Sequence, residues 1–128
     1  MTTTNFSDRQ TVLGAAAEVG PSNMGAGNGV DISLPAGAVL LRLIVLTTTA
    51  FNSVTTATLT VSDGTTTFAN AVDIKTTGSE TVANVPKYYP TGGKLSVTLA
   101  QTGGDATAGA AVVIPEYVVT DRWSENQY

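Results

Sequence analysis

The feature that most constrains this chain is a two-residue alternation of aliphatic side chains with threonine or serine, repeated in short runs. In residues 58–62, Leu59 and Val61 alternate with hydroxyl-bearing residues, and residues 94–99 repeat the pattern. Because successive side chains of a β-strand point to opposite faces, both runs predict strands with one buried and one solvated face. Threonine occupies 22 of the 128 positions, and its β-branched side chain favours strands.

Turn signals divide the chain from Pro35 onward into short segments, at the spacing of about 8 to 12 residues that is typical of a sandwich or barrel. The clearest are Asp63-Gly64, Thr77-Gly78-Ser79 and Pro90-Thr91-Gly92-Gly93. We expect these turns to join successive antiparallel neighbours. With strands over residues 11–19 and 30–34 as well, the sequence predicts an all-β antiparallel β-sandwich of about eight strands.

Two runs are apolar on nearly both faces. Residues 39–46 are broken only by Arg42, so we expect a central strand whose outer face is covered by another element or another chain. Residues 111–119 are interrupted by Pro115, which has no N–H to donate to a neighbouring strand. We therefore place this run last in the sheet, at an edge or a bulge.

Residues 11–19 are open to two interpretations. Ser7 or Asp8 could cap a short helix, and the alanine run of residues 15–17 favours it. The strand interpretation completes the count of eight, and it is the one that we predict.

The composition excludes most enzyme chemistry. The chain has no cysteine and no histidine, which removes disulfides, thiolate nucleophiles, zinc sites of sulfur and imidazole, and every Ser-His relay. The carboxylates lie singly along the sequence, and no spacing predicts an acid pair. We expect no enzyme activity, no catalytic residues, no cofactor, no metal site and no small-molecule substrate.

The charge balance and the lack of long apolar runs limit the partners further. The net charge of −4 and the pI near 4.4 have the wrong sign for a protein that neutralises phosphates, so we expect no nucleic acid partner. No run of 18 apolar residues is present and the first residues do not resemble a secretory signal. The sequence therefore predicts no membrane association, and synthesis in the cytoplasm.

Two short motifs allow a binding role beside a structural one. Asp63-Gly64 offers oxygen atoms to calcium, but no Asp-x-Asp-x-Asp-Gly loop surrounds it, so we favour a hairpin turn. Lys87, Tyr88 and Tyr89 could form a platform on which a sugar or a nucleobase stacks, although the two rings would also serve packing, which we favour.

The two ends of the chain differ from its body. We expect an extended N-terminal arm over residues 1–10, a sandwich domain over 11–121 and a C-terminal tail over 122–128. The ends carry three of the eight aromatic residues, and such rings dock either on the sandwich itself or on a partner. The candidate partner-binding residues are Thr2, Thr3, Thr4, Asn5, Phe6, Asp8, Arg122, Trp123 and Tyr128.

The order of several segments resembles that of small β-sandwich decoration (capsid cement) proteins of bacteriophage heads. The segments are Leu34–Val39, Thr49–Ser53, Leu59–Gly64, Thr107–Gly109, Glu116–Val119 and Arg122, and residues 1–29 fall outside the resemblance. It implies a jelly-roll homotrimer on the outer capsid surface of the virion, bound to the major capsid protein and stabilising the shell. Phage proteins of this kind also include tail and spike components, so the alternative is a glycan-binding or tail/spike-associated module for host adsorption.

Overall fold

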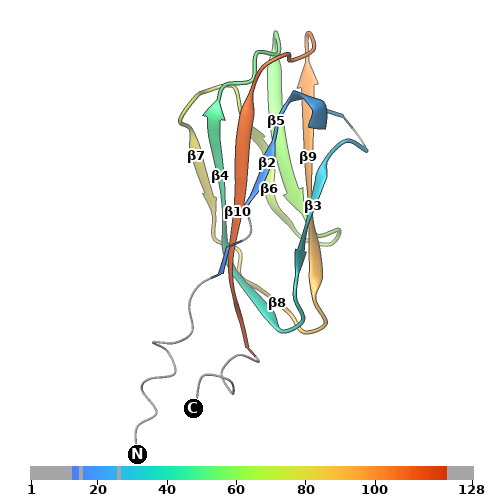
Figure 1. Cartoon of the computed structure of the whole chain (residues 1–128), viewed down its shortest axis with the longest axis vertical. Coiled ribbons are helices and arrows are strands. Elements are labelled where there is room, and N and C mark those ends of the chain that lie inside the picture. Colours follow the sequence, from blue (N-terminus) through green and yellow to red (C-terminus); the bar gives the residue numbers. More distant parts are fainter. Residues whose placement is uncertain (1–12, 15, 26, 121–128) are drawn as a thin grey trace, which may run out of the picture.

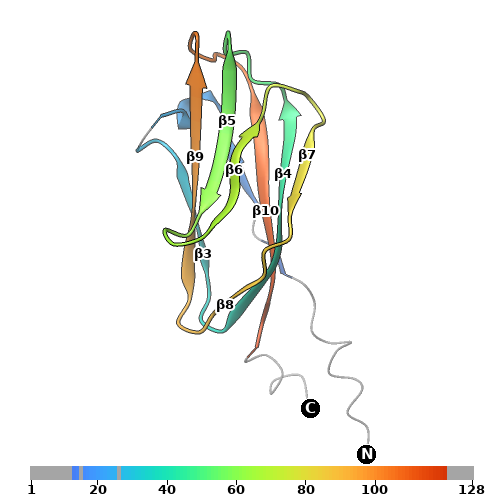
Figure 2. The ribbon, with the colours of Figure 1, turned by 180° about the vertical axis from the view of Figure 1, so that it is seen from behind.

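The computed structural model describes residues 13–14, 16–25 and 27–120, which form two antiparallel β-sheets packed face to face (Figure 1). Sheet A contains β1 (Leu13–Gly14), β2 (Ala17–Val19), β4 (Ala38–Thr49), β7 (Glu80–Ala83), β8 (Lys87–Tyr89) and β10 (Ala110–Val119). Sheet B contains β3 (Val30–Leu34), β5 (Thr56–Ser62), β6 (Thr67–Asp73) and β9 (Gly93–Thr102). A three-residue 3₁₀ helix, η1 (Pro21–Asn23), links β2 to β3. The view from behind has sheet B in front (Figure 2).

The strand pairing is that of a jelly roll. β1 and β2 lie in line along one side of β10, and β7 and β8 lie in line along one side of β4, so ten strands fill eight positions. The pairs are nested: β1/β2 with β10, β3 with β9, β4 with β7/β8, and β5 with β6. A long hairpin rolled into two sheets has this pairing. The predicted all-β sandwich of about eight strands is confirmed.

The expectation that strands joined by a turn also pair is wrong for two of the three turns. Asp63-Gly64 does join a pair, β5 and β6. The turn at residues 77–79 leads from β6 in sheet B to β7 in sheet A, and the turn at residues 90–92 leads from β8 in sheet A to β9 in sheet B. Glycine and proline show where the chain reverses, but they do not determine in which sheet the next strand lies.

Of the two alternatives for residues 111–119, an edge or a bulge, the edge is wrong. β10 lies inside sheet A, between β1/β2 and β4, and Pro115 pairs with Leu43. On its other side, β1 ends at Gly14 opposite Glu116 and β2 begins at Ala17 opposite Val113. Pro115 therefore lies opposite the interval between two short strands, where a missing N–H costs no ladder hydrogen bond. A bulge follows between Glu116 and Tyr117.

The strand interpretation of residues 11–19 is confirmed where the structure describes them. Leu13–Gly14 and Ala17–Val19 are both strands, paired with β10. Val19 lies in the core with 2% of its surface exposed. Burial against the opposite sheet outweighs the helix preference of the neighbouring alanines.

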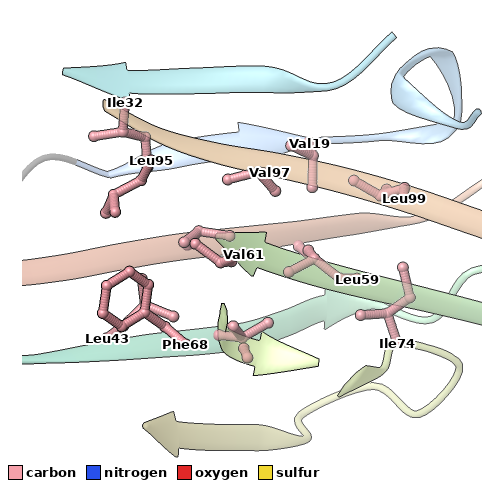
Figure 3. Close-up of a cluster of buried hydrophobic side chains, with 14 of the residues drawn as sticks. Val19, Ile32, Leu43, Leu59, Val61, Phe68, Ile74, Leu95, Val97 and Leu99 are labelled. Carbon is pink, nitrogen blue, oxygen red and sulfur yellow. The ribbon is translucent and has the colours of Figure 1, made fainter. Parts of the chain in front are cut away.

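One aliphatic core fills the space between the sheets (Figure 3). Val19 and Leu43 of sheet A face strands of sheet B that contribute Leu59, Val61 and Leu95. The alternating runs of residues 58–62 and 94–99 lie in β5 and β9, and their aliphatic residues are at most 2% exposed. Each such side chain stabilises the fold by about 1.5–3 kcal/mol relative to an exposed one.

Candidate functional surface

The candidate partner-binding residues of the two ends lie outside the described residues. This applies to Thr2, Thr3, Thr4, Asn5, Phe6 and Asp8 of the arm and to Arg122, Trp123 and Tyr128 of the tail. The structure does describe the strands next to them. β1 begins opposite Tyr117 and β10 ends at Val119, so both strands meet the ends of the chain at the same end of sheet A (Figure 1).

The outer faces of the two sheets differ in chemistry. Strands β3, β5 and β9 of sheet B alternate buried aliphatic residues with outward polar ones. The outward residues are Asp31, Ser33, Thr56, Thr58, Thr60, Ser62, Lys94, Ser96, Thr98, Ala100 and Thr102, all polar except Ala100. Such a hydroxyl-rich face is compatible with water, as expected for the exposed side of an antiparallel sheet.

The outer face of sheet A is aliphatic instead. Along β4 and β10, outward apolar residues alternate with buried residues such as Leu43, Val45 and Val113. The register of the strands brings the outward residues of neighbouring strands side by side. We call this surface the apolar face; it consists of Val39, Ile44, Leu46, Val82, Tyr88, Val112, Ile114 and Val118. Val82 is 41% and Tyr88 54% exposed. No described segment of the chain covers this face.

Four charged residues share the outer side of sheet A. In its middle, Arg42 of β4 donates from Nε to the carboxylate of Glu116 directly opposite on β10. At one end, Glu18 of β2 lies opposite Val112, and Glu80 of β7 lies opposite Leu46. Neither of these two glutamates has an ionic partner within the described ranges. The apolar face thus has a neutral ion pair at its centre and unpaired negative charge at one end.

A buried ion pair ties the two sheets together. Asp63, in the turn after β5, has only 4% of its side chain exposed and binds the ammonium of Lys87 on β8. The Tyr89 hydroxyl donates to Oδ2 of Asp63 at 2.8 Å, and the ammonium of Lys87 lies 5.4 Å from the centre of the Tyr89 ring. The contact therefore joins a turn of sheet B to an edge strand of sheet A.

The same Asp63 carboxylate organises its own turn. Its Oδ1 accepts the backbone N–H groups of Thr65 at 2.9 Å and Thr66 at 2.6 Å. Burial alone would raise the pKa of Asp63, but hydrogen bonds from Lys87, from these two amides and from Tyr89 outweigh it and hold that pKa well below its usual range. The hairpin interpretation of Asp63-Gly64 is confirmed, because this turn joins the paired strands β5 and β6. Both carboxylate oxygens of Asp63 accept hydrogen bonds from the protein itself.

The predicted sugar-stacking platform is divided between two environments. Tyr89 is 7% exposed and, like Lys87, binds Asp63. Only Tyr88 faces outward, opposite Val39 on β4. Since neighbouring residues of a strand point to opposite sides, these three side chains do not form one surface.

The described residues offer few features suited to binding a small molecule or a metal ion. A shallow depression lies against β3 and β9, lined by Gly27, Gly29, Asp31, Ser96, Val97 and Thr98. Nowhere in the described ranges do three acidic side chains converge as a metal site requires. No described helix has the length or apolar character needed to cross a bilayer.

Sequence reasoning found part of the apolar face and missed the rest. The run of residues 39–46 already required a cover for its outer side. Val82 and Tyr88 gave no such signal, because only the pairing of β7 and β8 with β4 brings them beside Ile44 and Val39.

The fold and this surface define a small jelly-roll protein with one polar and one apolar outer face. No protein-family model and no curated protein matches the sequence. Similar solved structures come from bacteriophage capsids: the cyanophage Pam1 capsid asymmetric unit, with 16% identity and a TM-score of 0.61; the capsid of Ralstonia phage GP4, with 19% and 0.57; and the acid-stable capsid of Helicobacter pylori bacteriophage KHP30, with 16% and 0.53. At these identities the likeness shows a shared fold.

The extent of these matches is nearly complete on both sides. They cover 86%, 85% and 86% of this chain and 86%, 84% and 93% of the respective other chain. Each is therefore a match between two small chains of similar length, and the jelly roll accounts for most of both.

Proposed function

We propose that this chain is a structural virion protein, a decoration (cement) protein that binds the outer surface of a bacteriophage head and stabilises the shell. The observation that supports this most is the jelly-roll fold, shared over 85–86% of this chain with chains in three phage capsid structures. The resemblance of segments between Leu34 and Arg122 to head decoration proteins points the same way. The role requires adhesion and no covalent chemistry.

The polar outer face of sheet B supports a position on the outside of the head. Its threonine and serine hydroxyls are compatible with solvent. The net charge of −4 would be repelled by the packaged DNA on the inside of the shell. Antibodies raised against the purified protein should label intact virions. Labelling that requires disrupted particles would contradict the outer location.

Self-association as a homotrimer, with the major capsid protein as the second partner, belongs to the same proposal. A chain of this size without disulfides has a modest core, and oligomerisation stabilises such a fold by mass action. Native mass spectrometry at micromolar concentration should then give three times the 13.0 kDa chain mass. A spectrum of monomer alone would contradict the homotrimer.

The terminal arm and tail are the proposed contacts with neighbouring subunits or the capsid. An extended chain over residues 1–8 would span about 25 Å at about 3.3 Å per residue, far enough to reach a neighbour. Deletion of residues 1–8 should lower the number of copies on the capsid and leave the β-sheet circular dichroism spectrum unchanged. Unchanged occupancy would contradict this role for the arm.

A further inference from the structure

The apolar face of sheet A is partly exposed, and no described element of the fold lies over it. Val82 and Tyr88 are 41% and 54% exposed, whereas the exposed positions on the strands of sheet B are polar, charged or alanine. A single exposed aliphatic residue needs no explanation, but a continuous patch marks an interaction site.

The dimensions of the apolar face fit the centre of a protein–protein contact. From Val39 to Leu46, β4 rises about 24 Å at about 3.4 Å per residue. The members of the apolar face lie on three strand positions spaced about 4.8 Å apart, β10, β4 and β7/β8, which gives a width of about 10–15 Å. The product, about 300 Å², is at the lower end of the range of functional patches on monomers, and is less than half of what one partner contributes to a standard interface. A surrounding polar rim would supply the rest.

The charges around the apolar face argue against a second copy of the same face as its occupant. Two copies packed with their strands parallel would bring together Glu18 and Glu80 of each, and antiparallel copies would place these glutamates against the opposite end of the face. In neither orientation do the described ranges offer them a free cation. Lys87 and Lys94 bind Asp63 and Asp31, and Arg42 binds Glu116. Lys75 donates to backbone carbonyls of the loop between β4 and β5. A complementary surface therefore has a basic rim that the described residues of this chain do not provide.

We infer that the apolar face is the surface by which this protein docks on the capsid shell, against a shell surface that is apolar at its centre and carries lysine or arginine at its rim. This inference rests on the proposed function and adds the contact that carries it. The Arg42–Glu116 pair lies within the interface as a neutral unit, while Glu18 and Glu80 meet the basic rim. Sheet B then faces away from the shell.

Binding of the purified protein to heads that lack it tests the docking surface. Val82→Glu places a charge in the apolar face, and Glu80→Lys reverses a charge at its rim. Each should weaken binding in a co-sedimentation assay by at least about tenfold. The matched controls on sheet B, Thr98→Glu and Asp73→Lys, should change affinity less than about twofold. Thermal unfolding followed by circular dichroism checks that every variant is folded.

Each outcome separates the docking surface from the proposed function. Undiminished binding of folded Val82→Glu and Glu80→Lys would overturn the docking surface and leave the decoration role intact. Failure of the wild-type protein to bind heads would overturn the decoration role and the docking surface with it. If Val82→Glu instead converts an oligomer to monomers in analytical ultracentrifugation, a second copy occupies the apolar face and the assignment to the shell is wrong.

Discussion

At the scale of single residues, Asp63 is a carboxylate that is buried between the two sheets and depends on its hydrogen-bond donors. Its carboxylate is almost fully buried and receives donors from its own turn and from β8 in the opposite sheet. A buried charge is tolerated only when its hydrogen bonds are satisfied, and removing one member of such a pair leaves the other unpaired. Asp63 is therefore the residue whose replacement most directly tests how the two sheets are held together.

The substitution Asp63→Asn should destabilise the protein by about 2 kcal/mol, because Lys87 keeps its charge and loses its anion. Urea unfolding measured at neutral pH gives this difference. Asp31→Asn is the control: its ion pair with Lys94 spans 3.4 Å, with 52% and 62% of the two side chains exposed. It should cost less than about 0.5 kcal/mol. Equal losses for the two variants would show that the Asp63 contact has no special role.

The lowered pKa of Asp63 also predicts how stability depends on pH. In the unfolded chain an aspartate titrates near pH 3.9, and in the folded protein it titrates well below that. The contribution of Asp63 is thus complete above about pH 4 and is lost as the pH falls further towards the folded pKa. Between about pH 4 and pH 2, the free energy of unfolding should fall more steeply for the wild-type protein than for Asp63→Asn. Parallel curves would contradict this linkage.

Tyr89 and Lys87 show why the sequence did not reveal this contact. Both aromatic packing and a sugar-binding role were compatible with the run from Lys87 to Tyr89. The hydrogen bond from Tyr89 spans 26 residues to Asp63, and it exists only because β8 and the β5–β6 turn lie in different sheets at the same end of the sandwich. Neither residue's neighbours in sequence carry that information.

At the scale of elements, β4 shows what periodicity can and cannot predict. Its outward and inward residues were both recognised as apolar, which placed it in the centre of a sheet, as observed. β10 is similarly apolar, but Pro115 predicts an edge or a bulge for it; the bulge is present after Glu116 and the edge is not. The interval between β1 and β2 that accommodates this proline depends on the register of three strands, which the sequence of β10 alone does not determine.

The two sides of sheet A should respond differently to one isosteric change. Val45→Thr places a hydroxyl in the core, where Val45 is 2% exposed, and should cost about 1–3 kcal/mol. Val82→Thr makes the same change on the apolar face and should cost less than about 0.5 kcal/mol. Thermal unfolding of the two variants at equal concentration measures the contrast. A large loss for Val82→Thr would mean that this face is already buried in the free protein.

At the scale of the whole molecule, the class of fold followed from the sequence and the topology did not. Alternation in residues 58–62 and 94–99 predicted two strands that are both present, each with the predicted face buried. The nested pairing of the jelly roll depends on which sheet each strand joins after a turn, as at residues 77–79 and 90–92. That choice is made by burial of whole faces against one another, which is a property of all the strands together.

The candidate functional surface, like the topology, could not be predicted in full from the sequence. Sequence reasoning directed attention to the aromatic residues of the two ends, such as Phe6 and Trp123, which lie outside the described residues. The pairing of β7, β8 and β10 with β4 revealed the apolar face instead. The two proposals are compatible, since β1 and β10 meet the two ends of the chain at one end of sheet A.

The measurement that tests the decoration role most directly is the copy number of this protein in purified virions, obtained by quantitative mass spectrometry against the major capsid protein. A protein that covers the shell should be present in hundreds of copies per particle, in a fixed ratio to the major capsid protein. A few copies per particle would indicate a tail or spike component, and absence from the particle would contradict a structural role in the virion.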